Sequence, residues 1–334
     1  MDPIQRRRLL QAGVAGGTLA ALGQAGTAFA QGQPFDTVRI VTGFPPGGTS
    51  DTLCRRLAEA MRGTSYAKTA VVDNKPGAGG QLAVEQMKIA PTDGSTILQT
   101  PASMLMIYPY VYKKLNYDPF NDVTPLSLAA TFGFGLAVGP AVPESVKTVG
   151  DFVKFCKANP DKANFGTPGA GSVPHFLGIL LSQAGGVDIK HVPFRGSQPA
   201  ILDMIGGQLS AVSAPEGEFF QHVKAGKIRL LATSGTTRSK FAPDTPTYVE
   251  QGFPTVNGKE WFGLFLPGKP TPEVLARANA AVRAALATQP VIDGLATMGL
   301  EATSSTPDEL KTLLRRDYER WGPIVKASGF TADS

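Results

Sequence analysis

The strongest constraint on the fold is a regular alternation of short apolar runs with amphipathic segments. The apolar run TVRIVTGF (37–44) precedes TSDTLCRRLAEAMRG (49–63), in which Leu53, Leu57 and Met61 recur at the spacing of one helix face. A chain that alternates strands and helices in this way forms a mostly parallel sheet with right-handed crossovers and helices on its faces. The sequence therefore predicts an α/β fold, in which GGQLAVEQMKIA (79–90) is expected to form one helix.

The alternation restarts in the middle of the chain, which predicts a second α/β unit. The strand candidate ANFGT (163–167) and the helix candidate VPHFLGILLSQAG (173–185) open this unit. Between the units, residues 124–143 are expected to form a long strand leaving the first unit, and residues 259–275 a strand that returns to it. The tail then contains helix candidates without new strands, which suit packing back onto the first unit.

We therefore expect two domains, each a mostly parallel sheet flanked by helices, joined by a two-strand hinge. Domain 1 is predicted to be discontinuous, covering 31–130 and 260–334, and domain 2 covers 131–259 with the hinge strands. Ligands of such folds bind beyond the carboxyl ends of the strands, in the crevice between the domains.

The first thirty residues have the features of an export signal. Arg6, Arg7 and Arg8 precede a weakly apolar stretch rich in Gly and Ala, and AFA (28–30) offers a cleavage site between small residues. Adjacent arginines favour the twin-arginine route. We expect a signal peptide over 1–30 and a periplasmic mature protein that does not span the membrane; the alternative is an uncleaved anchor.

Charge and cysteine content exclude several classes of protein. Without residues 1–30 the chain loses three Arg and one Asp, and its net charge falls from +5 to about +3, which does not indicate a nucleic-acid partner. The three histidines and two cysteines have no zinc-like spacing, so no metal and no cofactor is expected. Cys54 and Cys156 fall on the buried sides of different helices and are expected to be free thiols.

The loop FPPGGTSD (44–51) has the composition of an anion site between a strand and a helix. Gly47 and Gly48 leave the backbone N–H groups accessible, and the first turn of the following helix has N–H groups without partners at the positive end of the dipole. Thr49 adds a hydroxyl donor, and Asp51 is a candidate helix cap. The alternative is a plain capping loop.

Two further loops repeat this arrangement in the second unit. FGTPGAGSVPH (165–175) follows a strand candidate and opens a helix, with Ser172 as a natural cap. His175 in the same segment is either a ligand contact or a structural histidine. In PFRGSQPA (193–200), Arg195 either pairs with a carboxylate or lies on the surface. Facing anion loops in the two units predict a clamp for a small carboxylate.

No pattern in the sequence indicates catalysis. The chain lacks the G-x-S-x-G, S-x-x-K with K-T-G, and H-E-x-x-H motifs. Ser172 and His175 are three residues apart, but no third group that would orient the histidine is evident. We expect a binding protein and not an enzyme, with an exported α/β hydrolase as the less favoured alternative.

Several long segments, taken together, resemble the Bug-type extracytoplasmic solute receptors, the substrate-binding subunits of tripartite tricarboxylate transporters. The resemblance spans essentially the whole mature chain, in order. The segments that carry it are VRIVTGFPPGGTSD, VVDNKPGAGGQLAVEQMKIAPTDGSTIL, YPYVYKKLNYDPFNDVTPLSLAA, VPFRGSQPAILDMIGGQLSAV, GKIRLLATSG, APDTPTYVEQGFP and WFGLFLPGKPTPEVLARANAAVRAAL.

The resemblance implies a two-domain periplasmic-binding-protein clamp of type II that closes on a carboxylate and passes it to two membrane subunits. A monomer is expected, and a receptor that reports to a sensor protein is the alternative. The predicted ligand-binding residues are Phe44, Pro46, Gly47, Gly48, Thr49, Asp51, Ser103, Gly169, Gly171, Ser172, His175, Arg195 and Ser197.

The sequence departs from the family pattern at the position that is expected to contact the far end of the ligand. The family often has an Asp in the strand after GGQ, whereas this chain has Ala214 and Pro215 there, with Glu216 beyond. Few acids and several aromatic residues predict an aromatic carboxylate, with a citrate-like acid or an amino acid as alternatives. The aromatic candidates are Phe44, Phe194, Phe219, Phe220 and Trp261.

Overall fold

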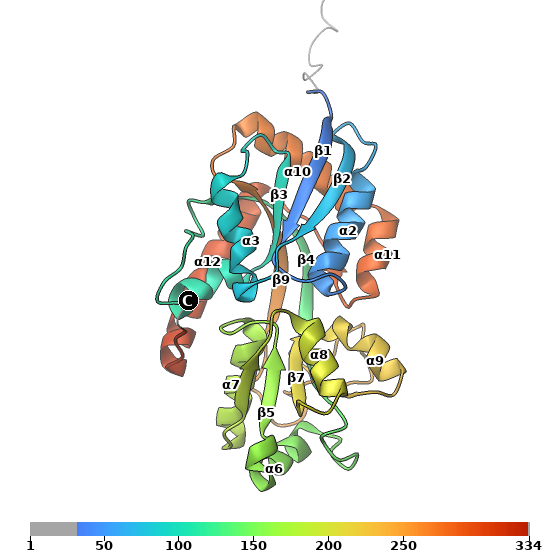
Figure 1. Ribbon diagram of the computed structural model, residues 1–334, viewed down its shortest axis with the longest axis vertical. Coiled ribbons are helices and arrows are strands. Elements are labelled where there is room, and N and C mark those ends of the chain that lie inside the picture. Colours follow the sequence, from blue (N-terminus) through green and yellow to red (C-terminus); the bar gives the residue numbers. More distant parts are fainter. Residues whose placement is uncertain (1–31, 333–334) are drawn as a thin grey trace, which may run out of the picture. The chain divides into compact units, whose positions relative to one another are not determined.

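The computed structural model describes residues 32–332 (Figure 1). The predicted signal peptide, residues 1–30, lies outside the described residues, so the export route stays a prediction. Within 32–332, no helix is both long enough and apolar enough to cross a membrane.

One sheet of ten strands runs through the described part of the chain. Its strand order is β2-β1-β3-β9-β4-β7-β5-β6, and β8 and β10 also pair with β4. The strands are β1 (Phe35–Thr42), β2 (Ala67–Asn74), β3 (Thr96–Pro101), β4 (Val123–Val138), β5 (Asn164–Thr167), β6 (Lys190–Pro193), β7 (Ala211–Pro215), β8 (Arg229–Thr233), β9 (Lys259–Pro267) and β10 (Glu301–Ala302).

Helices cover this sheet along its whole length (Figure 1). They are α2 (Thr49–Met61), α3 (Gln81–Glu85), α4 (Ser103–Met106), α5 (Tyr108–Val111), α6 (Val149–Ala158), α7 (Val173–Gly185), α8 (Ser197–Ile205), α9 (Phe220–Lys224), α10 (Pro272–Leu286), α11 (Gln289–Ala296) and α12 (Pro307–Ser328). Short 3-10 turns are η1 (Ala78–Gly80), η2 (Gln86–Ile89), η3 (Pro160–Lys162) and η4 (Glu216–Glu218).

Strand β4 belongs to both halves of the sheet. Its residues 123–133 pair antiparallel with β9, whereas residues 134–138 pair antiparallel with β7 and β8. Strands β1, β2 and β3 are parallel to one another, as are β5, β6 and β7. The expected long strand leaving the first unit and the strand returning to it are therefore β4 and β9. Figure 1 shows both strands running between the half of the sheet with β1, β2 and β3 and the half with β5 and β7.

The segment 79–90, predicted as one helix, is broken in the structure. Only Gln81–Glu85 is α-helical, between the 3-10 turns η1 and η2. The late start of the α-helix follows from Gly79 and Gly80, whose φ angles of 63° and 98° are left-handed. A side chain at Gly43 would come within 2.6 Å of Gly80 Cα, so these glycines allow two backbone segments to lie close together.

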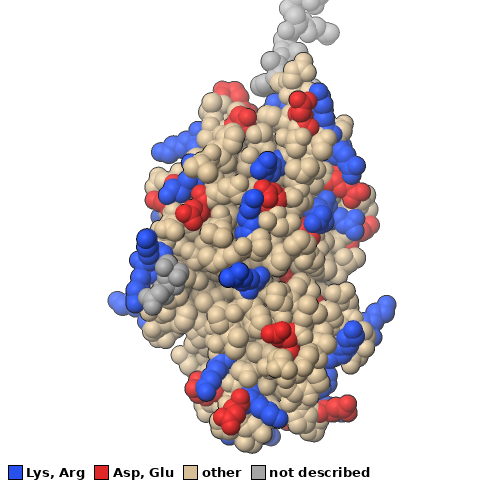
Figure 2. All heavy atoms as spheres, in the orientation of Figure 1, with Lys and Arg blue, Asp and Glu red and all other residues tan. Residues whose placement is uncertain are grey.

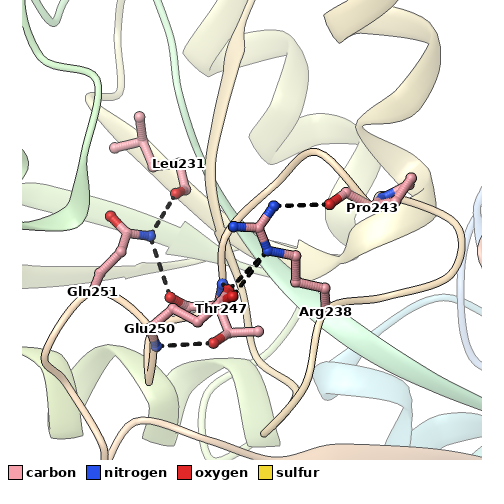
Figure 3. Close-up of polar contacts among 6 residues, drawn as sticks. All are labelled: Leu231, Arg238, Pro243, Thr247, Glu250 and Gln251. Atoms are coloured by element: carbon pink, nitrogen blue, oxygen red, sulfur yellow. Dashed lines mark hydrogen bonds and ion pairs between the residues drawn. The ribbon is translucent and has the colours of Figure 1, made fainter.

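The long connection from β8 to β9 is held in place by a polar cluster (Figure 3). The Glu250 carboxylate accepts hydrogen bonds from Arg238 Nε and from the Thr247 backbone N–H. Gln251 Nε2 donates to the Leu231 carbonyl oxygen, 2.9 Å away, which fastens the connection to β8. These bonds hold residues 238–251 together and against β8.

Buried polar contacts attach the C-terminal helices to β4 and β9. Trp261 Nε1 on β9 donates to Asp317 Oδ2 on α12 over 2.9 Å. On α10, Asn279 Nδ2 donates to the carbonyl oxygens of Leu126 (2.7 Å) and Ser305 (2.9 Å).

The free cysteines expected from the sequence are confirmed, because Cys54 on α2 and Cys156 on α6 are both buried and form no disulfide with each other.

Replacing Asn279 by Ala should lower the free energy of unfolding by about 1–3 kcal/mol, because two buried carbonyl oxygens lose their donor. Urea unfolding of the mature chain measures this. Asn257→Ala is the matched control, since the exposed Asn257 donates only to the Pro254 carbonyl oxygen and its loss should change little. Equal effects in the two variants would contradict the assigned role of Asn279.

Candidate functional site

A pocket with about 530 Å³ of empty space, part of it open to solvent, lies where the two halves of the sheet meet on β4. The residues that line it are Phe44, Pro45, Gly48, Thr49, Ser50, Pro101, Ser103, Met104, Tyr108, Phe132, Phe134, Pro168, Gly169, Ser172, Pro174, Ser197, Gln198, Pro215, Glu218, Glu260 and Phe262.

Strand register brings one wall of the pocket together. Side chains alternate between the two faces of a strand, so residues two apart share a face. Phe132 and Phe134 on β4 therefore point to the same side, as do Glu260 and Phe262 on β9, and Phe132 is paired with Glu260 across the two strands. The ring centroids of Phe132 and Phe262 lie 4.3 Å apart. Pro215 of β7, which pairs with Phe134, extends this wall.

Three of the longer helices begin at the pocket lining, as does the short helix α4. Thr49 and Ser50 are the first residues of α2, Ser172 precedes α7, and Ser197 opens α8. The first-turn N–H groups of a helix lack internal acceptors and form the positive end of its dipole. The pocket thus combines an apolar aromatic wall with helix starts that favour negatively charged groups.

A carboxylate of the chain itself occupies the start of α2. Glu218, at the end of η4, accepts hydrogen bonds at Oε1 from the Thr49 N–H (3.1 Å) and the Thr49 hydroxyl (2.8 Å), and at Oε2 from Gln198 Nε2 (3.1 Å). Glu218 is only 4% exposed, and burial raises its pKa. The contact joins α2 to the segment that follows β7, and so connects the two halves of the pocket.

A second buried carboxylate lies at the start of β9. Glu260 accepts hydrogen bonds from the N–H and the hydroxyl of Ser103, the first residue of α4. The Ser103 hydroxyl oxygen in turn accepts from the Val173 N–H at the start of α7, 3.3 Å away. Burial, with a smaller contribution from the charge of Asp317, raises the pKa of Glu260 to about 7.

The structure brings seven of the predicted ligand-binding residues into the pocket lining and leaves six outside it. The seven in the lining are Phe44, Gly48, Thr49, Ser103, Gly169, Ser172 and Ser197. The six outside it are Pro46, Gly47, Asp51, Gly171, His175 and Arg195. For all thirteen residues, direct contact with a ligand stays a prediction.

Asp51 has contacts that shape the first loop. Its Oδ2 accepts from the Gly47 N–H (3.0 Å) and from Arg55 Nε (2.8 Å), and its Oδ1 accepts from Asn74 Nδ2 (3.0 Å). Burial opposes the charge of Asp51, but these donors outweigh it and hold the pKa below its usual value. The residue at the cap position of α2 is Gly48, so Asp51 closes the loop instead of capping the helix.

His175 and Arg195 also lie away from the pocket lining. His175 Nδ1 accepts from the Gly171 N–H, 3.0 Å away, and the ring stacks on His191 with centroids 3.8 Å apart. Burial lowers the pKa of His175 to about 3, so the ring is neutral at physiological pH. Arg195 is exposed. His175 thus has partners within the protein and Arg195 lies on the surface, and contact of either residue with a ligand stays a prediction.

The two buried acids are the main residues that the sequence did not reveal. Glu216 was the acid that the sequence placed nearest the far end of the ligand, but its side chain lies outside the pocket lining and accepts a hydrogen bond from the Ser239 hydroxyl. Glu218, two residues later, enters the pocket instead. The aromatic residues of the lining also differ from those predicted. Of the predicted aromatic residues, Phe44 lines the pocket, whereas the lining does not include Phe194, Phe219, Phe220 or Trp261.

Comparison with known proteins places the chain in a family. A model described as the tripartite tricarboxylate transporter family receptor matches residues 53–330. The chain belongs to this family. The structure of the periplasmic binding protein BugD is 27% identical, with a TM-score of 0.83 over 89% of this chain and 99% of BugD. The predicted family and the periplasmic-binding-protein fold are thereby confirmed, whereas the domain boundaries stay a prediction.

Two other similar structures contain small acids. MatC from Rhodopseudomonas palustris, solved with bound malate, is 28% identical, with a TM-score of 0.80 over 86% of this chain and 98% of MatC. An R. palustris protein solved with adipate is 27% identical, with a TM-score of 0.83 over 89% of this chain and 98% of that protein.

Gly48→Asp should disrupt the pocket, because a Cβ at position 48 would lie 3.3 Å from Glu218 Oε1 and the new carboxylate would repel Glu218. We expect a loss of about 1–3 kcal/mol in the free energy of unfolding and no stabilisation by ligand. Gly150→Asp is the control, since the nearest atom to its Cβ is 3.8 Å away. Ligand-induced stabilisation retained in Gly48→Asp would contradict the pocket assignment.

Stability should also report the proton on Glu260. Its pKa rises from 4.5 to about 7 on folding, so the folded state holds this proton more tightly than the unfolded state. The stabilisation from this group is complete below about pH 4.5 and is lost as the pH rises through 7, a change of about 3 kcal/mol at most.

The measurement is urea unfolding of the wild type and Glu260→Gln at about pH 5 and about pH 8. The stability of the wild type relative to the variant should fall between these pH values, because the amide does not titrate. Glu144→Gln, at an exposed position, should show no such trend. A stability difference between wild type and Glu260→Gln that is independent of pH would contradict the raised pKa.

Proposed function

We propose that this chain is a periplasmic receptor that captures a small organic acid and delivers it to the membrane subunits of a tripartite tricarboxylate-type transporter. Membership of the receptor family supports the role, and the similar proteins with malate and adipate support the class of solute. The observation that carries the proposal is the pocket at the junction of the two sheet halves, with the starts of α2 and α7 at its edge.

The pocket is built for closure around a solute. Thr49 and Ser103 come from one half of the sheet with its helices, whereas Ser172 and Glu218 come from the other. A solute that contacts both halves at once interacts fully only with the closed form, so it shifts the equilibrium toward closure. The closed form is then the shape that the membrane subunits recognise.

The lining favours an acid with an apolar body. Five aromatic rings and five prolines contribute to it, and these offer few partners for the many polar groups of a citrate-like acid. We infer an aromatic or aliphatic carboxylate whose acid group lies near the helix starts. The aromatic rings are those of Phe44, Tyr108, Phe132, Phe134 and Phe262.

The contacts of Ser172 and His175 argue for binding and against hydrolysis. The Ser172 hydroxyl donates to the Gly169 carbonyl oxygen over 2.7 Å, while His175 Nδ1 accepts from the Gly171 N–H. Neither contact activates the serine, which would need a histidine nitrogen as its proton acceptor. A receptor that reports to a sensor protein would use the same pocket, and the neighbouring genes would distinguish that role.

Thermal melting of refolded, ligand-free residues 31–334 tests the proposal. The panel is malate, adipate, citrate, benzoate, nicotinate, phthalate, glutamate and protocatechuate. A solute at about a thousand times its dissociation constant adds about 4 kcal/mol to stability, which raises the melting temperature by several degrees. We expect a selective rise with one acid, lost in Gly48→Asp. A flat response to all acids would overturn the carboxylate assignment.

A further inference from the structure

The ligand pocket has two acidic side chains in its described lining and no basic one. Among the described residues that line it, Glu218 and Glu260 are the only members of the set Asp, Glu, Lys, Arg and His, and each is 4% exposed. The face shown in Figure 2 differs, because basic and acidic side chains are interspersed over it. Any charge that these side chains carry is therefore negative.

Both carboxylates are satisfied only by neutral donors. Glu218 is bonded to Thr49 and Gln198, and Glu260 to Ser103. In the part of the chain that the structure describes, the ion pairs found involve neither acid. A buried carboxylate without a positive partner costs several kcal/mol even when it is hydrogen-bonded, so each acid gains stability from a cation beside it.

A purely acidic solute would meet unfavourable electrostatics in this pocket. A dicarboxylate such as adipate would place two negative charges near Glu218 and Glu260, and no Lys, Arg or His of the described lining compensates them. Glu218 and Glu260 would then be ionised only against this repulsion. Like charges in a medium of low dielectric constant repel strongly. Specificity in such a site arises as much from this repulsion as from attraction.

The rest of the lining is also suited to a cation. The faces of aromatic rings carry partial negative charge and attract ammonium groups, with a larger effect where water is excluded. Phe132 lies opposite Glu260 on the paired strands β4 and β9 and packs against Phe262. Tyr108 and Phe134 line the same space. Acidic and aromatic side chains together form the usual environment of a bound ammonium group.

We propose that the solute carries a positively charged nitrogen, which binds between Glu218, Glu260 and the aromatic wall. This inference rests on the proposed function, because it takes this pocket as the solute site. A carboxyl group on the same solute would bind at the helix starts, so the two proposals describe opposite ends of one molecule. The chemical class is an amino- or alkylammonium-bearing organic acid with an apolar body.

Two matched series of compounds test the charge preference directly. The aliphatic series is adipate, 6-aminohexanoate and 1,6-diaminohexane, which share one chain length. The aromatic series is terephthalate, 4-(aminomethyl)benzoate and 1,4-bis(aminomethyl)benzene. Dissociation constants come from calorimetry on the refolded mature chain. We expect an amine-bearing member to bind at least about tenfold more tightly than the diacid of its series.

Variants then assign the preference to the two acids. Glu218→Gln and Glu260→Gln keep the shape of the side chain but remove the charge, so each should reduce the preference for the amine by about tenfold or more. Circular dichroism at the same temperature checks that both variants are folded. Glu144→Gln is the matched control at an exposed position and should bind like the wild type.

The outcomes separate this inference from the proposed function. If acids stabilise the protein and no amine-bearing compound binds better than its diacid, the inference is overturned and the proposed function stands. If amines bind best but both glutamine variants retain that preference, the nitrogen lies elsewhere and the inference is also overturned. If neither acids nor amines bind, both proposals fail.

Discussion

The antiparallel pairing between β4 and β9 is the interaction on which the rest of the structure depends. It joins the two halves of the sheet, and its register also places Phe132, Glu260 and Phe262 around the pocket. A shift of one residue would turn every one of these side chains to the other face of the sheet. Trp261, which lies between the two pocket residues on β9, points away and is fixed by Asp317 on α12.

Much of the fold could be predicted from the sequence, because hydrophobic periodicity reflects local geometry. The periodic segment around Leu53 and Leu57 became α2, and VPHFLGILLSQAG became α7 with the predicted bounds. The segment 79–90 was predicted to be one helix, but its α-helix begins only after the left-handed Gly79 and Gly80, where Gly43 lies close to Gly80, and a 3-10 turn replaces it from Gln86. Such a contact between distant segments leaves no periodic signal.

The site was less predictable for a related reason. Glycine-rich loops indicate accessible backbone N–H groups in the sequence. Gly48, Thr49 and Ser172 from such loops do line the pocket. Glu218 and Glu260 enter it only because of long-range geometry. Glu260 contacts Ser103, 157 positions away, and Glu218 contacts Thr49, 169 positions away. Thr49 and Ser103 were predicted as site residues from the sequence, but their partners Glu218 and Glu260, and the further donor Gln198, were not.

The contact between Glu218 and Thr49 has a consequence for how tightly any solute is held. A solute group that takes the Thr49 N–H must displace a carboxylate already bound there, so the observed affinity is the difference between two competing interactions. When the solute leaves, the same carboxylate can return to the vacated N–H. Release of such a solute group is then an exchange, in which Glu218 replaces it at the Thr49 N–H. This competition by Glu218 shortens the time for which the solute stays bound.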